Sequence, residues 1–238
     1  GRCLSSGAPG PRFACGPGVV PSPLTFRLAG THGAARLWAR GGCKPTVSSC
    51  VLFGVEDDAI HFGREAVAEY VPGAEGRLMR SLKSVLGTAL IGDTTRVKAR
   101  TLGFLDILGI FLAEVKRRGE AELGGEIDSV TVGRPVQFVD GDPVADRQAQ
   151  GQLEQAVRAQ GFAHVAFQFE PIAAALDFER QTVREQLVLI VALGGGTSAF
   201  SVVRVSPERA QTSDRSDDIL ATAGVPVGGA GCDRLRAA

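Results

Sequence analysis

The sequence predicts an α/β fold, and two observations support this prediction. Between residues 127 and 180, short apolar segments typical of strands alternate with amphipathic segments typical of helices. Strand, helix, strand and helix in this order are characteristic of domains in which parallel strands are joined by helical crossovers. The chain has 238 residues, of which 44% are hydrophobic and 22% charged, so it can bury a substantial core.

The amino-acid composition of the first half of the chain changes along its length. Residues 1–23 are crowded with Gly, Pro and Ser and have no helical or strand periodicity, so we expect a disordered leader there. The run TVSSCVLF at 46–53 predicts a strand, and residues 61–70 predict a short helix. Leucines at three- and four-residue steps predict a helix over 101–118, ending in a cationic turn before Gly119.

The second half supplies the alternating elements. Two strands are expected at 127–132 and 164–169, with a helix over 145–160 between them. A further helix is expected over 171–180, where Pro171 is suited to the first turn. Beyond it, two apolar runs within 187–205 flank a triple glycine.

Charge and cysteine usage exclude several classes of function. Twenty-six basic residues balance 26 acidic ones, which argues against a nucleic-acid partner and against binding to an anionic membrane surface. The most apolar helical stretch, 101–115, contains Asp106 and is shorter than the ~20 residues that span a bilayer. Five scattered cysteines without a Cys-x-x-Cys pair indicate reduced thiols and argue against a structural metal site. We expect a cytoplasmic protein.

The segment Gly194-Gly195-Gly196-Thr197 follows an uninterrupted run of apolar residues, 187–193. Bare glycines leave backbone N–H groups open to an anion such as phosphate. A Walker A loop is excluded because no Gly-Lys-Ser/Thr follows. A Rossmann loop must open a helix, whereas residues 200–205 are rich in β-branched residues and predict a strand. A β-hairpin with a glycine-rich tip remains, either as a phosphate loop or as a plain turn.

Two motifs make the sequence resemble a known family. EPIAAALDFE at 170–179, followed by LIVALGGGTSAFSVV at 189–203, resembles the ATPase domain of the heat-shock protein 70 (DnaK-type) chaperones. Weaker matches fall in the same order along the chain, namely KPTVSS, LKSVLG and VPVGGAGCD. The resemblance covers roughly residues 24–238.

This resemblance implies an actin-like, hexokinase-type (ribonuclease H-like) ATPase fold that binds ATP with Mg²⁺. Residues 24–186 then form a nearly complete first lobe, and 187–238 only begin a second. Lys83 matches the lysine that faces the phosphates, and Glu170 matches the catalytic glutamate. Implied partners are the nucleotide and, by the family's nature, unfolded clients or co-chaperones. The residues that match the two phosphate hairpins are Gly30, Thr31, Gly194, Gly195, Gly196 and Thr197.

Three acids of the family pattern are missing. The positions of the hairpin aspartates are occupied by Leu28, Ala192 and Ala199, which offer no oxygen to the waters of a magnesium ion. The sequence therefore predicts ATP binding with weakened or lost hydrolysis. Alternatives are a degenerate, truncated member of the group that neither binds nor hydrolyses, a non-catalytic interaction module with an actin-like core, or another actin-like ATPase such as a sugar kinase or filament protein.

Overall fold

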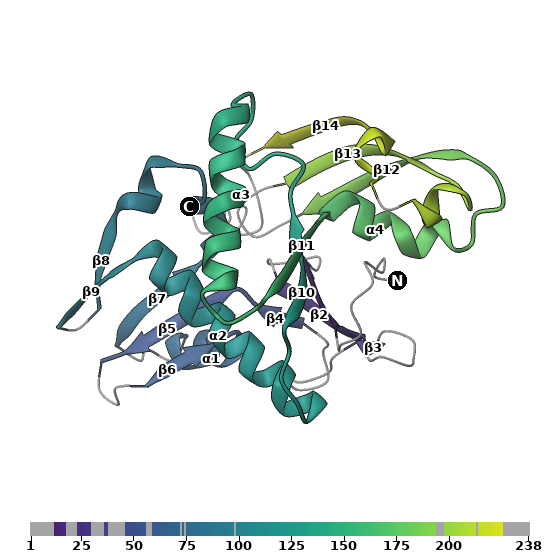
Figure 1. The fold of residues 1–238 in the computed structure, drawn as a ribbon. Coiled ribbons are helices and arrows are strands. Elements are labelled where there is room, and N and C mark those ends of the chain that lie inside the picture. Colours follow the sequence, from purple (N-terminus) through teal and green to yellow (C-terminus); the bar gives the residue numbers. More distant parts are fainter. Residues whose placement is uncertain are drawn as a thin grey trace.

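The computed structural model describes residues 12–17, 23–29, 36–37, 46–55, 59–71, 73, 75–97, 99–193, 198–212 and 214–225. Within these ranges the protein is a mixed α/β structure, with small sheets and helices packed between and against them (Figure 1). The predicted fold class is confirmed at this level.

The largest sheet combines parallel and antiparallel strands in the order β11-β10-β1-β2-β3, and β4 also pairs with β2. Strands β11, β10 and β1 are parallel neighbours, whereas β2 is antiparallel to β1, β3 and β4. The two predicted strands of the alternating region are β10 and β11, so the predicted parallel pair is confirmed. The strand bounds are β1 Arg12–Pro17, β2 Pro23–Ala29, β3 Arg36–Leu37, β4 Thr46–Ser48, β10 Ser129–Arg134 and β11 His164–Phe169.

The expected disordered leader is wrong for residues 12–17. These residues form β1, which is paired with β10 on one side and with β2 on the other. The local sequence RFACGP gives little strand signal. The strand is formed by backbone pairing with β10, which is distant in sequence, and with β2, the next strand along the chain. The other residues before β2 lie outside the described part of the chain.

A second sheet has the order β6-β5-β7, and the short helix α1 packs against it. The expected strand over 46–53 is divided, since β4 joins the largest sheet and β5 belongs to this one. The expected helix over 61–70 begins later, because its first residues form β6 and the chain turns at Gly63, where φ is +66°. The bounds are β5 Cys50–Gly54, β6 Ile60–Phe62, α1 Arg64–Tyr70 and β7 Gly76–Arg80.

The chain then forms two short 3₁₀ helices, a hairpin and the longest described helix. These elements are η1 Leu82–Val85, η2 Ala89–Gly92, β8 Thr94–Val97, β9 Arg100–Gly103 and α2 Phe104–Leu123. Helix α2 continues past Gly119 and ends at Leu123, where it is capped by Gly124, whose φ of +71° is the left-handed conformation that stops a helix. The prediction of an end at Gly119 was wrong, because one glycine costs a helix only about 1 kcal/mol. None of the described helices is both long and apolar enough to cross a membrane.

Helix α3 (Pro143–Arg158) connects β10 to β11 as predicted. Its N-cap is Asp142, whose carboxylate accepts hydrogen bonds from the backbone N–H groups of Val144 and Ala145, both at 3.0 Å. The main core lies where α2 and α3 meet β5 and β10. Its largest fully buried side chains include Phe111, Ile107 and Leu153, which recur at helical spacing on the inner faces of the two helices.

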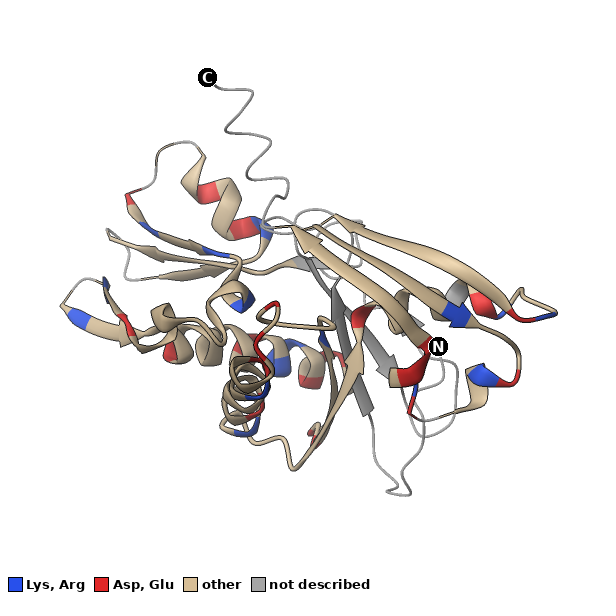
Figure 2. Cartoon of the chain, turned by 90° about the horizontal axis from the view of Figure 1, so that it is seen from above, with Lys and Arg blue, Asp and Glu red and all other residues tan. Residues whose placement is uncertain are grey.

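A separate three-stranded antiparallel sheet, β12-β13-β14, packs one face against helix α4 (Figure 1). Ile172 and Ala175 of α4 are buried there against Val203 and Val205. The outer face is apolar and exposed; Leu187 and Leu189, for example, are 63% and 61% exposed. In the ribbon of Figure 2, few positions along these strands carry the colours of charged residues. The bounds are α4 Glu170–Glu179, β12 Gln186–Leu193, β13 Ser198–Val205 and β14 Ile219–Val225, with η3 Arg209–Gln211 and η4 Ser216–Asp218 between the last two strands.

Strand β5 is buried on both faces, and its burial lowers the expected reactivity of the thiol of its first residue, Cys50. The Cys50 thiol donates a hydrogen bond to the carbonyl of Gly63 at 2.8 Å. Burial raises the pKa of this thiol to about 11, although the charge of Arg80 acts in the opposite direction. We expect Cys50 to remain unalkylated by iodoacetamide at pH 8 in the native protein and to react after denaturation. Peptide mass spectrometry checks this, and modification under native conditions would contradict it.

Candidate functional site

Lys83 and Glu170, 87 residues apart in sequence, meet in the structure. The Lys83 ammonium lies 3.0 Å from Oε1 of Glu170 and also donates a hydrogen bond to the carbonyl of Gly133 at 2.8 Å. The two side chains are 28% and 22% exposed, so the pair is partly shielded from water but still reachable by a ligand. The structure thus brings together the two residues that the sequence marked as catalytic candidates.

Lys83 is held by the short turn η1 and by the chain that follows it. The residue before η1, Ser81, has a left-handed φ of +55°, which reverses the chain after β7. Leu82 and Leu86 are buried on the core side of this turn. Gly87 ends the segment with φ at +72°, and its N–H donates to Oε1 of Gln152 in α3 at 3.0 Å. The Lys83 side chain therefore projects from an anchored turn.

Glu170 follows β11 directly and is the first residue of α4. Pro171 occupies the first turn, where its missing N–H has no helical partner to lose. An acidic side chain is favoured at this end of a helix, because the helix dipole is positive there. The EPIAAAL sequence thus fixes a carboxylate at a strand-to-helix junction.

The pair lies at the carboxyl ends of the parallel strands β10 and β11. Gly133, which binds Lys83, is the second-to-last residue of β10 and is in register with Gln168 of β11. Ligands of open α/β sheets bind at this edge, where helices begin and backbone groups become available. The position of the pair is therefore suited to contact with a ligand.

The strands that flank the triple glycine form the predicted hairpin. Strand β12 ends at Leu193, β13 begins at Ser198, and these two residues are antiparallel partners. The absence of a helix at β13 confirms that the Rossmann interpretation fails. Gly194, Gly195, Gly196 and Thr197 themselves lie outside the described residues, as do Gly30 and Thr31 between β2 and β3.

Helix α4 begins at Glu170 of the Lys83–Glu170 pair and packs against the two strands of this hairpin. At the end of α4, the Glu179 carboxylate accepts a hydrogen bond at 2.9 Å from the N–H of Ser206, which directly follows β13. Glu170, at the start of the helix, therefore lies toward the opposite end of β13, where the hairpin connection is located. In Figure 1 the first turn of α4 correspondingly lies toward the arrowhead of β12.

Two of the three positions at which an aspartate of the family pattern is replaced lie on the hairpin strands. Ala192 of β12 and Ala199 of β13 are directly paired, so two methyl groups face each other where the family pattern has aspartates. Among the residues that the structure describes, no group of three His, Cys, Asp or Glu side chains could hold a metal ion. The described donor set offers no oxygen cluster suited to Mg²⁺.

Comparison with known proteins identifies the family. The model of the Hsp70 protein family matches residues 86–219, which is more than half of the chain. The chain belongs to the Hsp70 family. The resemblance seen in the sequence is thereby confirmed, and membership implies an actin-like ATPase fold in a family that generally binds ATP.

Individual Hsp70 relatives match the chain over most of its length. The chaperone protein HscA of Edwardsiella ictaluri is 33% identical over 223 residues, covering 80% of this chain and 35% of the relative. The chaperone protein DnaK of Thermotoga neapolitana is 31% identical over 179 residues, covering 75% of this chain and 27% of the relative. The chain thus spans about a third of the length of these Hsp70 relatives.

Arg134 ends β10 in this Hsp70-family chain, a position from which an arginine can contact a ligand or form a salt bridge. Its guanidinium binds Oδ2 of Asp146 at 2.7 Å and lies over the rings of Phe138 and Phe169, 5.2 and 5.1 Å from their centroids. Two of its N–H groups also donate to backbone carbonyls of the turn after β10. These contacts support the salt-bridge interpretation, in which Arg134 holds the turn beside the site.

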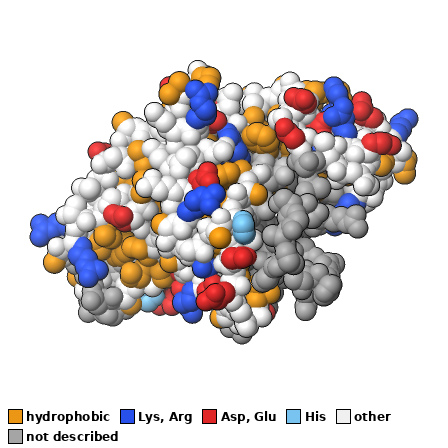
Figure 3. Space-filling model, viewed as in Figure 1, with side chains coloured by type: hydrophobic (Ala, Val, Ile, Leu, Met, Phe, Trp, Pro, Cys, Tyr) orange, Lys and Arg blue, Asp and Glu red, His pale blue; other side chains and the backbone are white. Residues whose placement is uncertain are grey.

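An open pocket of about 610 Å³ lies elsewhere in this Hsp70-family chain, between β5, β7 and β8. Phe53 and Val97 contribute apolar surface, and Glu75, Arg77 and Arg96 contribute charge. Figure 3 shows a hydrophobic area with basic side chains beside it over this part of the molecule. Neither Lys83 nor Glu170 lines the pocket, so its size does not make it the candidate site.

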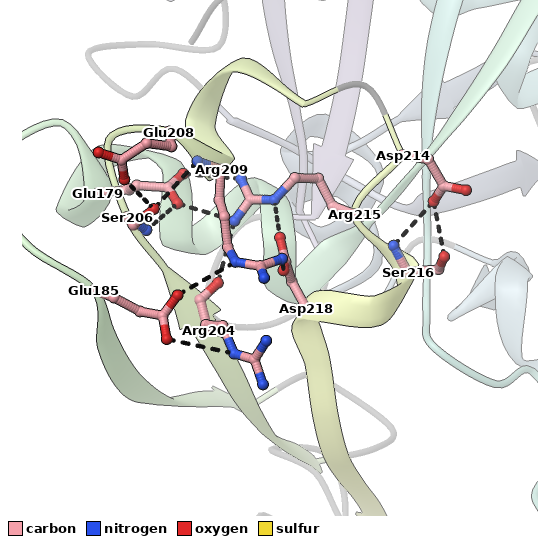
Figure 4. A network of polar contacts seen from close by, with 10 residues as sticks. All are labelled: Glu179, Glu185, Arg204, Ser206, Glu208, Arg209, Asp214, Arg215, Ser216 and Asp218. Atoms are coloured by element: carbon pink, nitrogen blue, oxygen red, sulfur yellow. Dashed lines mark hydrogen bonds and ion pairs between the residues drawn. The ribbon is translucent and has the colours of Figure 1, made fainter.

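Sequence reasoning missed one buried ionic network, shown in Figure 4. Taken as sequence alone, Asp214, Asp217 and Asp218 sit in a polar segment whose simplest interpretation is that all three are solvated. Asp218 departs from this, because only 1% of the residue is exposed. Asp218 pairs with Arg215, whose guanidinium also grips the buried carboxylate of Glu179. The sequence contains no signal for this network beyond an arginine and an aspartate three residues apart, a spacing common on exposed surfaces.

Proposed function

We propose that this Hsp70-family chain binds ATP at the Lys83–Glu170 edge, with hydrolysis weakened or lost. The observation that supports this most is the 3.0 Å contact between Lys83 and Glu170 at the carboxyl ends of β10 and β11. Lys83 would place positive charge against the nucleotide phosphates, and the backbone N–H groups of Gly194–Gly196 would cradle them. Gly30, Thr31 and Thr197 would complete the contacts with the phosphates.

In a hydrolytic reaction, Glu170 would accept a hydrogen bond from the attacking water and orient it, while Lys83 would compensate charge on the transferred phosphoryl group. Phosphoryl transfer depends chiefly on such positioning and on neutralisation of charge. The residues present do not fit the Mg²⁺ that the family resemblance implies, because Leu28, Ala192 and Ala199 carry no oxygen ligands. Part of the charge compensation that hydrolysis needs is therefore missing.

The domain division also belongs to this proposal. Residues 24–186 would correspond to the first lobe of an actin-like ATPase domain, and 187–238 to the beginning of the second. Support comes from the separation of the β12–β14 sheet from the largest sheet, with its own small core against α4. We place the protein in the cytoplasm, with unfolded clients or co-chaperones as partners in keeping with its chaperone relatives.

A phosphate-release assay tests the proposed loss of hydrolysis. We expect the wild-type chain to release phosphate from ATP no faster than Lys83→Ala, because the metal-binding acids are absent. Turnover typical of an active family member that disappears in Lys83→Ala would contradict the proposal. A full-length DnaK-type chaperone, assayed in parallel, shows that the conditions support hydrolysis.

One observation favours a second candidate, a non-catalytic interaction module. The outer face of β12–β14 exposes several large apolar side chains, among them Leu187, Leu189 and Val191. Contiguous apolar surface of this kind is typical of sites where another protein surface packs. Nucleotide titration separates the candidates, since an interaction module gives no binding heat with ATP.

A further inference from the structure

Glu179, Arg215 and Asp218 form an ionic network with almost no access to solvent. Their side chains are 0%, 3% and 2% exposed. Arg215 grips Glu179 with two parallel hydrogen bonds, from Nη1 to Oε2 and from Nη2 to Oε1, both at 2.9 Å. Its Nε faces Asp218, which also pairs with Arg209 (Figure 4). Two arginines thus balance the two buried carboxylates.

The network fastens the end of α4 to the β12–β14 sheet. Glu179 is the last residue of α4, and its Oε1 also accepts the N–H of Ser206 immediately after β13. Arg215 donates from Nη2 to the carbonyl of Arg204 within β13, at 3.2 Å. The end of α4 is therefore tied to β13 directly, by the hydrogen bond from Ser206, and through the guanidinium of Arg215, which binds both Glu179 and the carbonyl of Arg204.

Stability alone does not explain charged residues at this place. A carboxylate near the end of a helix meets the negative pole of the helix dipole, and its burial carries a desolvation penalty. Apolar side chains of similar volume are often as stabilising as a buried ion pair. A bidentate arginine–carboxylate contact is also directional, because it fixes the angle at which the two groups meet.

Fixing one end of α4 also fixes the other. The helix has ten residues, so its ends are about 15 Å apart, and over this length a helix moves as one body. A small roll of α4 on the sheet would move Glu170 away from Lys83. We propose that the Glu179–Arg215–Asp218 network acts as a positioning clamp that holds Glu170 within hydrogen-bond distance of Lys83. The functional meaning of this clamp rests on the proposed function of the Lys83–Glu170 pair.

Zero-length crosslinking reads the geometry of the pair directly and needs no nucleotide. A carbodiimide joins an amine and a carboxylate in contact as an amide, so the wild-type chain is expected to yield a Lys83–Glu170 crosslink detectable by mass spectrometry. Lys116 and Glu120, 3.4 Å apart within α2, provide an internal reference in the same digest. The measured quantity is the ratio of the two crosslinked peptides.

The test variant replaces Glu179 and Arg215 together by methionine, which removes the clamp and leaves Asp218 paired with Arg209. We expect the crosslink ratio to fall by about tenfold, because a misplacement of about 1 Å sharply slows reaction between held groups. Glu179→Gln keeps the size of the side chain but removes its charge, and a smaller fall in the same direction is expected. Circular dichroism verifies that each variant is folded, and Glu179→Gln serves alone if the double variant is not.

Glu185→Gln is the matched control, because Glu185 lies at the exposed edge of the same network, beside Arg209. Its ratio should equal that of the wild type. An unchanged ratio in folded variants that lack the clamp would overturn the inference, and so would an equal fall in Glu185→Gln. Failure of ATP binding with a clamp-dependent crosslink would instead overturn the proposed function and leave the positioning clamp standing.

Discussion

Replacing Arg215 with alanine is expected to lower the free energy of unfolding by about 3–5 kcal/mol, the range typical of breaking one side of a buried ion pair. The Glu179 carboxylate would lose both of its hydrogen bonds from the guanidinium and keep only the N–H of Ser206. Burial lowers the pKa of Arg215, but the hydrogen bonds and charges of Glu179 and Asp218 together outweigh it and raise the pKa above its usual value, so the arginine is charged at every working pH. Urea denaturation followed by circular dichroism measures the loss.

Glu185→Ala is the control for this prediction. Glu185 is 58% exposed and approaches Arg204 and Arg209 only at 3.9 and 3.5 Å. Exposed pairs of this kind contribute at most about 1 kcal/mol because water screens them. Equal losses in Arg215→Ala and Glu185→Ala would show that the buried network does not hold the β12–β14 sheet to α4.

Replacing Gly87 with alanine is expected to destabilise the fold by about 2–5 kcal/mol, the sum of left-handed strain and overpacking. Gly87 has φ at +72°, and a Cβ there would lie 2.9 Å from the carbonyl of Ala145, from Ala149 and from Val139. Backbone atoms of α3 cannot give way without moving the helix. Because Gly87 ends the segment that carries Lys83, the substitution should also disturb the Lys83–Glu170 contact.

Gly141→Ala is the matched control, since Gly141 has φ at +73° but nothing within 4 Å of the added Cβ. This variant measures the left-handed strain alone, about 1–2 kcal/mol. Thermal unfolding of the two variants separates strain from packing. A Gly87→Ala protein as stable as Gly141→Ala would contradict the close packing of the Lys83 segment against α3.

Apolar periodicity and helix-start or turn residues in the sequence were sufficient to predict the strand and the helix of residues 164–180. The strand at 164–169 and the helix beginning at Glu170 lie within one residue of the predicted bounds, because Pro171 and the apolar spacing act locally. Strand β1 was missed, since its order depends on pairing with β10 and β2. The split between β4 and β5 was missed for a similar reason, as one apolar run serves two sheets.

The candidate site was predictable only where a motif marked it. Lys83 and Glu170 followed from the resemblance to the Hsp70 family, and the structure places them in contact. Glu179 was part of the same EPIAAALDFE motif but was not recognised, because its partner Arg215 lies 36 residues away in an irregular segment. Contacts between distant polar residues leave no periodic trace in a sequence, whereas a helix face does.

Calorimetric titration of the chain with ATP, in Mg²⁺ and again in excess chelator, tests most directly the claim that nucleotide binding has survived without a metal site. The residues described here predict weak binding of equal affinity in both conditions, and its loss in Lys83→Ala. Tight binding that requires Mg²⁺ would contradict the absence of metal-holding acids at Leu28, Ala192 and Ala199. The absence of binding heat in both conditions would contradict nucleotide binding itself.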